Sequence, residues 1–125
     1  MTAGWLHRLA NGDRTPSPGR VDVRQAYEKL STDQVAQIVD VREPSEWAET
    51  GVPPRALLIP LGQIDRRAAA EIAKGRPVYT ICRSGSRSMT AAKKLAKLGY
   101  TDVKSIDGGM RAWIAAGLPV KAYER

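Results

Sequence analysis

The stretch Val78-Tyr79-Thr80-Ile81-Cys82-Arg83-Ser84-Gly85-Ser86-Arg87-Ser88 joins an apolar, β-forming run to the only cysteine of the chain. Gly85 and the small hydroxyl residues around it favour a tight loop, and from Ser88 onward the apolar spacing becomes helical. In such an arrangement backbone N–H groups point into the loop, with the positive end of the helix dipole behind them. This environment attracts an anion and favours a thiolate over a thiol. The sequence therefore predicts that Cys82 is reactive.

The competing interpretation is that Cys82 is only a packing residue, because a lone cysteine is more often a small buried hydrophobe than a nucleophile. Four features would have no purpose around a packing cysteine. They are its place directly after an apolar run, Gly85 where the chain must bend, arginines at positions 83 and 87, and an immediate helix start. Together these features favour the reactive interpretation.

The composition predicts one domain, since 125 residues, 42% of them hydrophobic, suffice for a single core but not for two. One cysteine excludes an intrachain disulfide. The sequence shows neither an apolar signal segment nor a membrane-spanning run, so we expect a cytoplasmic protein with no membrane partner. The net charge of +7 suits an anionic substrate, an acidic protein partner or nucleic acid, and charge alone does not choose among them.

We expect residues 1–20 to form a mobile arm, residues 21–120 the folded domain, and residues 121–125 a carboxyl-terminal tail. The alternation of strands and helices in the domain predicts an α/β fold, with a five-stranded, mainly parallel sheet and helices on both faces. Ligands of such sheets bind beyond the carboxyl ends of the strands, where residues 82–87 lie. The expected strands are 21–23, 35–41, 56–61, 78–81 and 103–106, and the expected helices are 24–30, a turn from 44 to 47, 64–74, 88–98, and a last one ending at 117.

Three motifs resemble those of the rhodanese family of sulfurtransferases. The family's D-V-R-x-x-x-E-W/Y segment is matched by Asp40-Val41-Arg42-Glu43-Pro44-Ser45-Glu46-Trp47. Its C-R-S-G-x-R-S active loop resembles Cys82-Arg83-Ser84-Gly85-Ser86-Arg87-Ser88, and its G-G-x-x-x-W close resembles Asp107-Gly108-Gly109-Met110-Arg111-Ala112-Trp113. The resemblance runs from about residue 21 to 120. It implies a single-domain rhodanese-like fold in which Cys82 carries sulfur.

The sequence departs from the family pattern at two places. Where the family usually has G-H-I-P-G-A, the chain has Gly51-Val52-Pro53-Pro54-Arg55-Ala56, which changes a segment expected beside the site. Loops that use thiosulfate commonly read C-R-K-G-x-T, and Ser84 replaces their lysine, which would add a charge for the sulfonate end. This replacement weakens the expectation that thiosulfate is the natural donor.

The expected reaction is attack of the Cys82 thiolate on the outer sulfur of a small anionic donor, such as thiosulfate or a persulfide. The resulting Cys82 persulfide then passes its sulfur to cyanide, a thiol or a protein acceptor. Net sulfur transfer needs no cofactor, and no metal site is expected. Backbone amides of the loop would cradle the terminal sulfur, as an oxyanion hole does for oxygen. The substrate-binding residues predicted in this loop are Arg83, Ser84, Gly85, Ser86 and Arg87.

The charged residues of the first two motifs are expected to bind the donor or to support the loop. Arg83 and Arg87 are expected to steer and orient the anionic donor, but Arg87 could equally pair with Asp40 or another acid as a structural brace. Asp40 and Arg42 are expected to support the site as scaffold.

Three other functions compete with sulfur transfer. A cysteine phosphatase or arsenate reductase also uses a cysteine and an arginine around an anion, but those phosphatases have five residues between the two, and only four separate Cys82 from Arg87. A non-catalytic interaction module is compatible with the lysine-rich helix at residues 93–97, although the retained cysteine argues against it. Nucleic-acid binding is disfavoured because these lysines lie on one helix face without interleaved aromatic residues.

Overall fold

Strands and helices alternate along residues 17–124, the part of the chain that the structure, a computed structural model, describes. Both the short loops and the order of elements follow the expected α/β pattern. The elements are β1 (Gly19–Val21), α1 (Val23–Thr32), β2 (Gln37–Asp40), α2 (Pro44–Thr50), β3 (Leu57–Leu58), η1 (Leu61–Gln63), α3 (Ile64–Glu71), β4 (Val78–Ile81), α4 (Ser86–Lys97), β5 (Val103–Ile106) and α5 (Gly109–Ala115).

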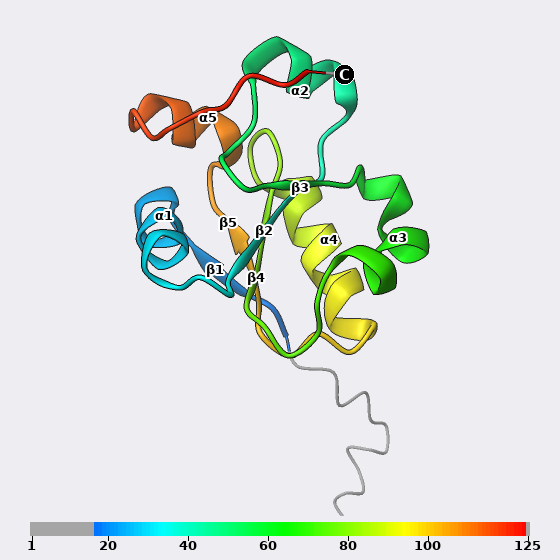
Figure 1. The fold of residues 1–125 in the computed structure, drawn as a ribbon. Helices are drawn as coiled ribbons and strands as arrows, with labels where there is room; N and C mark the ends of the chain where they lie inside the picture. Colours follow the sequence, from blue (N-terminus) through cyan, green and yellow to red (C-terminus); the bar gives the residue numbers. More distant parts are fainter. Residues whose placement is uncertain (1–16, 125) are drawn as a thin grey trace, which may run out of the picture.

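All five strands pair in parallel in the order β1-β5-β4-β2-β3, so β4 lies in the middle of the sheet (Figure 1). Each residue of β4 is buried, as expected of a strand covered on both faces. Successive side chains alternate between the faces, which places Val78 and Cys82 in one apolar cluster and Tyr79 and Ile81 in the other. The predicted fold class is confirmed.

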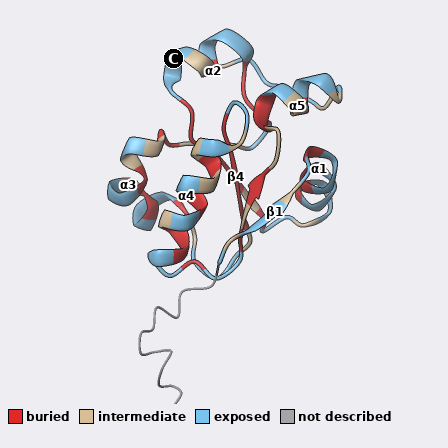
Figure 2. Cartoon of the chain, turned by 180° about the vertical axis from the view of Figure 1, so that it is seen from behind, coloured by how far each residue is buried: buried red, intermediate tan, exposed pale blue. Residues whose placement is uncertain are grey.

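Each face of the sheet is covered by its own pair of helices. On one side, α3 and α4 contribute residues such as Ile64 and Leu95 to a cluster that also contains Cys82. On the other, α1 and α5 contribute residues such as Ala26 and Trp113. Buried residues follow the strands and the inward sides of these helices (Figure 2). The remaining helix, α2, lies beyond the carboxyl ends of the strands (Figure 1).

The first strand begins two residues earlier than the sequence predicts. Asp22, expected in the middle of a strand, is instead the N-cap of α1, where its carboxylate accepts from the Gln25 N–H at 2.8 Å and the Gln25 side chain binds the Asp22 N–H. This reciprocal capping starts the helix at once. Gly19 and Arg20, assigned to the arm, therefore belong to the sheet, and the arm's residues 1–16 lie outside the described residues.

Other boundaries also differ from the expected ones. The strand predicted at residues 56–61 shrinks to β3, because Pro60 has no N–H to donate and the chain turns into η1. The helix predicted at 64–74 ends at Glu71, and the turn predicted from 44 to 47 is a seven-residue helix. The helix after the cysteine starts at Ser86 rather than Ser88. Its first turn is thus part of the loop predicted to bind substrate.

The end of the described chain packs back onto the domain. Val52 and Lys121 form an antiparallel bridge with N–H···O distances of 2.8 and 2.7 Å. The Tyr123 ring then meets Trp47 edge-on at 5.4 Å between centroids. Residues 121–124 are thereby held against α2. Among the described residues no helix combines the length and the apolar character needed to cross a bilayer.

The cap of α1 gives a first prediction. Replacing Asp22 with Ala removes the acceptor for the Gln25 N–H, so the free energy of unfolding measured in urea should fall by about 1 kcal/mol. Glu28→Ala is the matched control, because Glu28 is exposed on the same helix and its side chain caps nothing among residues 17–124. Equal stability losses in the two variants would contradict the capping role.

Candidate active site

The loop from β4 to α4 emerges beside α5 and below α2, at the edge of the sheet where the strands end (Figure 1). Cys82 follows β4 directly and is 1% exposed. Gly85 has φ of +126°, a conformation that side chains rarely tolerate, and it lets the chain turn back into α4 within three residues. The sulfur of Cys82 thus lies near the amino-terminal end of α4, a twelve-residue helix.

The sulfur of Cys82 faces polar donors despite its burial. The Gly85 N–H donates to Sγ at 3.0 Å, and the Ser88 hydroxyl lies 3.5 Å from the same atom. Burial raises the pKa of the thiol, but hydrogen bonds from the Ser88 hydroxyl and from the amides of Ser88, Gly85 and Ser84 outweigh it, so the pKa is lowered below its ordinary value. The loop therefore favours the thiolate.

The opposite side of the loop is held by α5. The Met110 N–H donates to the carbonyl of Cys82 at 2.8 Å, and the Arg111 N–H donates to that of Arg83 at 3.1 Å. Gly109 lies so close to these carbonyls that a Cβ there would stand 2.5 Å from Arg83 O and would also clash with Cys82 O. Because α5 binds the carbonyls, the amides of the loop are left to face the sulfur.

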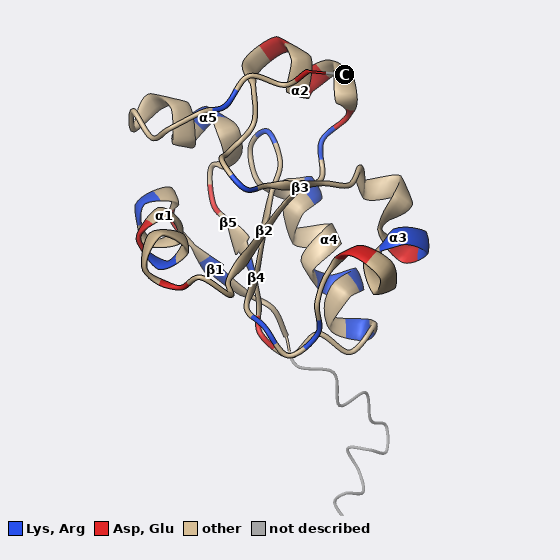
Figure 3. Cartoon of the chain, viewed as in Figure 1, with Lys and Arg blue, Asp and Glu red and all other residues tan. Residues whose placement is uncertain are grey.

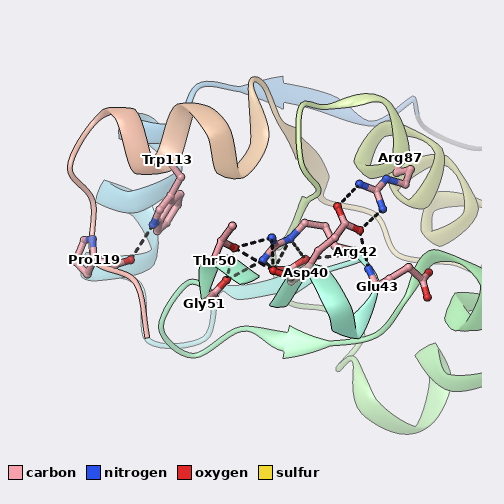
Figure 4. Close-up of polar contacts among 9 residues, drawn as sticks. Asp40, Arg42, Glu43, Thr50, Gly51, Arg87, Trp113 and Pro119 are labelled. Atoms are coloured by element: carbon pink, nitrogen blue, oxygen red, sulfur yellow. Dashed lines mark hydrogen bonds and ion pairs between the residues drawn. The ribbon is translucent and has the colours of Figure 1, made fainter. Parts of the chain in front are cut away.

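Arg87 is paired with Glu46 of α2. Its two terminal nitrogens donate to the two carboxylate oxygens at 2.7 and 2.8 Å (Figure 4). This double hydrogen bond holds the pKa of Glu46 at about 2, although partial burial acts in the opposite direction. Of the alternatives left open by the sequence, the geometry favours a brace, and the acid is Glu46 rather than Asp40.

Asp40 and Arg42 form a buried ion pair with an Nη2···Oδ2 distance of 2.7 Å. Arg42 also donates to the hydroxyl of Thr50 and to the carbonyl of Gly51, both at 2.9 Å (Figure 4). The guanidinium therefore joins the carboxyl end of β2 to the far end of α2. That the two residues support the site stays a prediction.

Arg83 and Arg111 are exposed, and both line a cavity of about 110 Å³ between the loop, α2 and α5. Neither side chain forms an ion pair or hydrogen bond with any residue of the described range, 17–124. Glu46 on the same cavity is neutralised by Arg87, so the two arginines leave this rim cationic although Glu49 also borders it. Elsewhere Lys and Arg are distributed over several helices and loops (Figure 3).

Three residues that contribute to the site were not predicted from the sequence. Glu46 stood in a recognised motif, but its partner could not be read from spacing because Arg87 lies 41 positions further along the chain. Arg111 and Gly109 lie in the closing motif, and only their contacts with Arg83 reveal that they border the loop. Within residues 17–124 no group of three His, Cys, Asp or Glu side chains is arranged to bind a metal ion.

Comparison with known proteins agrees with this geometry. The family model described as "Rhodanese-like domain" matches residues 22–116. The protein belongs to this family, and its five-stranded parallel sheet with helices on both faces is the fold expected from the motifs.

Similar proteins point to sulfur transfer in general. A sulfurtransferase of Allochromatium vinosum is 38% identical over 83% of this chain and 95% of its own length. The thiosulfate sulfurtransferase GlpE of Vibrio cholerae is 31% identical over 82% of this chain and 93% of its own length. A solved structure from Rhodopseudomonas palustris, described as a possible tyrosine phosphatase, has a TM-score of 0.77 at 25% identity and covers 84% of this chain and 86% of its own.

The Arg87–Glu46 pair predicts a specific loss of stability in acid. Because the pKa of Glu46 in the folded chain is about 2 rather than 4.5, its contribution to stability is complete above pH 4.5 and is lost as the pH falls toward 2. After allowance for solvent screening, the contribution amounts to about 1–3 kcal/mol. Urea unfolding at pH 6 and pH 3 should therefore show a smaller difference for Glu46→Gln than for the wild type.

The control for this measurement is Glu49→Gln, which changes an exposed carboxylate of the same helix. This variant should keep the pH dependence of the wild type. If Glu46→Gln loses as much stability in acid as the control does, the pair does not stabilise the fold.

Proposed function

We propose that the protein transfers sulfur through a persulfide on Cys82. The observation that carries the proposal is the Gly85 N–H donating to Sγ at 3.0 Å at the start of α4, which favours the nucleophilic thiolate. The sulfur would attack the outer sulfur of a donor such as thiosulfate. An S–S bond forms as the S–SO₃ bond breaks, and sulfite leaves with the electron pair. No proton or external electron is required.

The second half of the reaction, transfer of the sulfur to an acceptor, also balances without an added proton or electron. A nucleophile such as cyanide or a thiolate attacks the terminal sulfur of the persulfide, and Cys82 departs as the thiolate with which it began. Amides of residues 83–87 would stabilise the negative charge on the terminal sulfur, as donors in an oxyanion hole do. Support comes from the α5 contacts, which occupy the carbonyls of Cys82 and Arg83 and leave the amides on the sulfur side.

The donor we propose is a small anion, thiosulfate or a low-molecular-weight persulfide. Arg83 and Arg111 supply positive charge to the cavity beside the loop, and the paired Arg87 contributes mainly as a brace. Cys82 is 1% exposed, so a donor must present a narrow end, as the outer sulfur of thiosulfate does. The name of the Vibrio cholerae relative supports thiosulfate, whereas Ser84 in place of lysine argues for a broader choice of donor.

Phosphate-ester hydrolysis is the competing activity, raised by the description of the Rhodopseudomonas palustris structure. Two observations disfavour it. The loop has four residues between Cys82 and Arg87, one fewer than the phosphatase loops discussed above. In addition, both terminal nitrogens of Arg87 are taken by Glu46, so this arginine is not available to bind a phosphate. Turnover of p-nitrophenyl phosphate lost in Cys82→Ser would reverse this assignment.

A non-catalytic interaction module is the other alternative. A module that only bound a partner would gain nothing from donors aimed at a buried sulfur, yet Gly85 and Ser88 both lie within hydrogen-bonding distance of it. The geometry therefore favours chemistry at Cys82 over docking alone.

The first test of the function is Cys82→Ser. This variant keeps the shape of the site but lacks the sulfur nucleophile, so formation of thiocyanate from thiosulfate and cyanide should fall to background. The mass increase of one sulfur atom on incubation with donor should disappear as well. Thr90→Ala, which changes an exposed hydroxyl residue of α4 outside the loop, controls for disturbance of the helix. Sulfur transfer retained in Cys82→Ser would exclude the mechanism.

The second test concerns the donor. Arg83→Ala and Arg111→Ala should each raise the KM for thiosulfate about 3- to 10-fold, with a smaller effect on kcat, because each removes one charge that attracts the anion. The increase should shrink at high ionic strength, since salt screens exposed charges. Arg66→Ala removes an exposed arginine on α3 and serves as the control. Equal effects of all three variants would show that only net charge matters.

A further inference from the structure

Beneath the sulfur lies a chain of buried hydroxyl groups from two further elements. Ser88 of α4 is fully buried, and its Oγ lies 3.5 Å from Cys82 Sγ. Ser105 of β5 is 1% exposed, and its Oγ lies 2.7 Å from Ser88 Oγ. The chain thus runs from β5 through α4 to the cysteine at the end of β4, and the mechanism above makes no use of Ser105.

The direction of the Ser105–Ser88 hydrogen bond follows from the available acceptors. Ser105 has Ser88 Oγ as the only acceptor for its hydroxyl proton within residues 17–124. Ser88 has other acceptors, because the carbonyl of Gly85 lies 3.0 Å away and the sulfur lies on another side. A buried hydroxyl proton without an acceptor is costly. The arrangement that satisfies both groups has Ser105 donating to Ser88.

Ser88 then has one proton for two acceptors. With a neutral thiol, the Ser88 hydroxyl donates to the Gly85 carbonyl, and the thiol proton points to Ser88 Oγ. With a thiolate, the hydroxyl turns and donates to the sulfur. The Gly85 carbonyl is not left without a donor by this rotation, because the Met89 N–H also reaches it at 3.3 Å. Rotation of the Ser88 hydroxyl therefore accommodates both the thiol and the thiolate and leaves no buried polar group without a hydrogen-bond partner.

We propose that Ser105 is a positioning residue for Cys82: by donating to Ser88, it directs the single Ser88 proton toward the sulfur when the sulfur is negative. The inference deepens the proposed function and depends on it for its role in turnover. When an S–S bond forms, the charge moves from Sγ to the terminal sulfur. The Ser88 hydroxyl then rotates back and donates its hydrogen bond to the Gly85 carbonyl again. The proton stays on the Ser88 oxygen throughout, so neither an acid nor a base is consumed.

Charged residues lie on the elements around Cys82. Arg83 lies in the loop, and Arg87 lies in the first turn of α4, paired with Glu46 of α2. The Asp40–Arg42 pair lies at the end of the neighbouring β2, and Arg111 lies on α5. None of these side chains forms a hydrogen bond or ion pair with Ser105 in the described part of the chain. Substitutions at Ser105 consequently change the hydroxyl chain while leaving the charges in place.

The test is the pH profile of Cys82 alkylation by iodoacetamide in the full chain. In Ser105→Ala the midpoint should move to higher pH, and alkylation at pH 7 should slow about 3- to 10-fold, since the thiolate loses part of its hydrogen-bond support. The control is Thr80→Val. Thr80 is also buried and donates to the Ser88 backbone carbonyl at 2.8 Å, so its loss removes a similar bond without touching the hydroxyl chain. The control should keep the wild-type midpoint.

A second arm separates the hydroxyl from packing at this position. Ser105→Thr and Ser105→Val add the same volume, and only the threonine retains a donor. The Thr variant should alkylate near the wild-type rate and the Val variant should be slow. Because Ser105 is argued to act through Ser88, Ser105→Ala made in a Ser88→Ala background should cause no further slowing.

The proposal is overturned if Ser105→Ala keeps the wild-type midpoint, if Thr80→Val shifts it equally, or if the Ser88 and Ser105 effects add. The assay reports ionisation of the thiol and requires no sulfur donor. If the Ser105→Ala midpoint shifts but the protein transfers no sulfur, the proposed function is refuted and the role of Ser105 stands. If the protein transfers sulfur normally but the Ser105→Ala midpoint does not shift, the role of Ser105 is refuted and the proposed function stands.

Discussion

The site depends on the hydrogen bond from the Gly85 N–H to the sulfur of Cys82. A buried thiolate without donors would be costly, so a loop that binds it must turn its amides inward. That orientation is imposed from outside the loop, because the first amides of α5 bind the carbonyls of Cys82 and Arg83. Gly109 permits this approach, since the space that its Cβ would need is filled by the loop backbone. The double glycine of the closing motif is thus part of the sulfur site.

Two ion pairs link the start of α4 to α2 and α2 to β2. Arg87 fastens the first turn of α4 to α2 through Glu46. Arg42 fastens α2 to the end of β2 through Asp40 and the carbonyl of Gly51. The Asp40–Arg42 pair is buried, and removing either partner would leave the other charged in a dry environment. The three motifs recognised in the sequence, residues 40–47, 82–88 and 107–113, therefore contact one another around Cys82.

The sequence predicted the central strands well and their surroundings less well. Strands β4 and β5 have the boundaries expected, because all residues of β4 and all but one of β5 are buried in the sheet. The first strand was misplaced because Asp22 suits a helix cap better than a strand, a local effect that apolar periodicity does not register. Cys82 could be singled out from its loop as the candidate nucleophile, but the partner of Arg87 could not, since it comes from a distant helix.

Burial in the core and a polar environment for the sulfur, which the sequence presented as alternatives, occur together at Cys82. Cys82 belongs to the apolar cluster beneath α3 and α4, which is what a packing cysteine would do. Its sulfur also receives donors from Gly85 and Ser88, which a packing cysteine would not require. In a dry site each such bond acts with less screening than in water, so a few donors offset the cost of burying a charge. The hydrocarbon surroundings thus strengthen the hydrogen bonds that favour the thiolate.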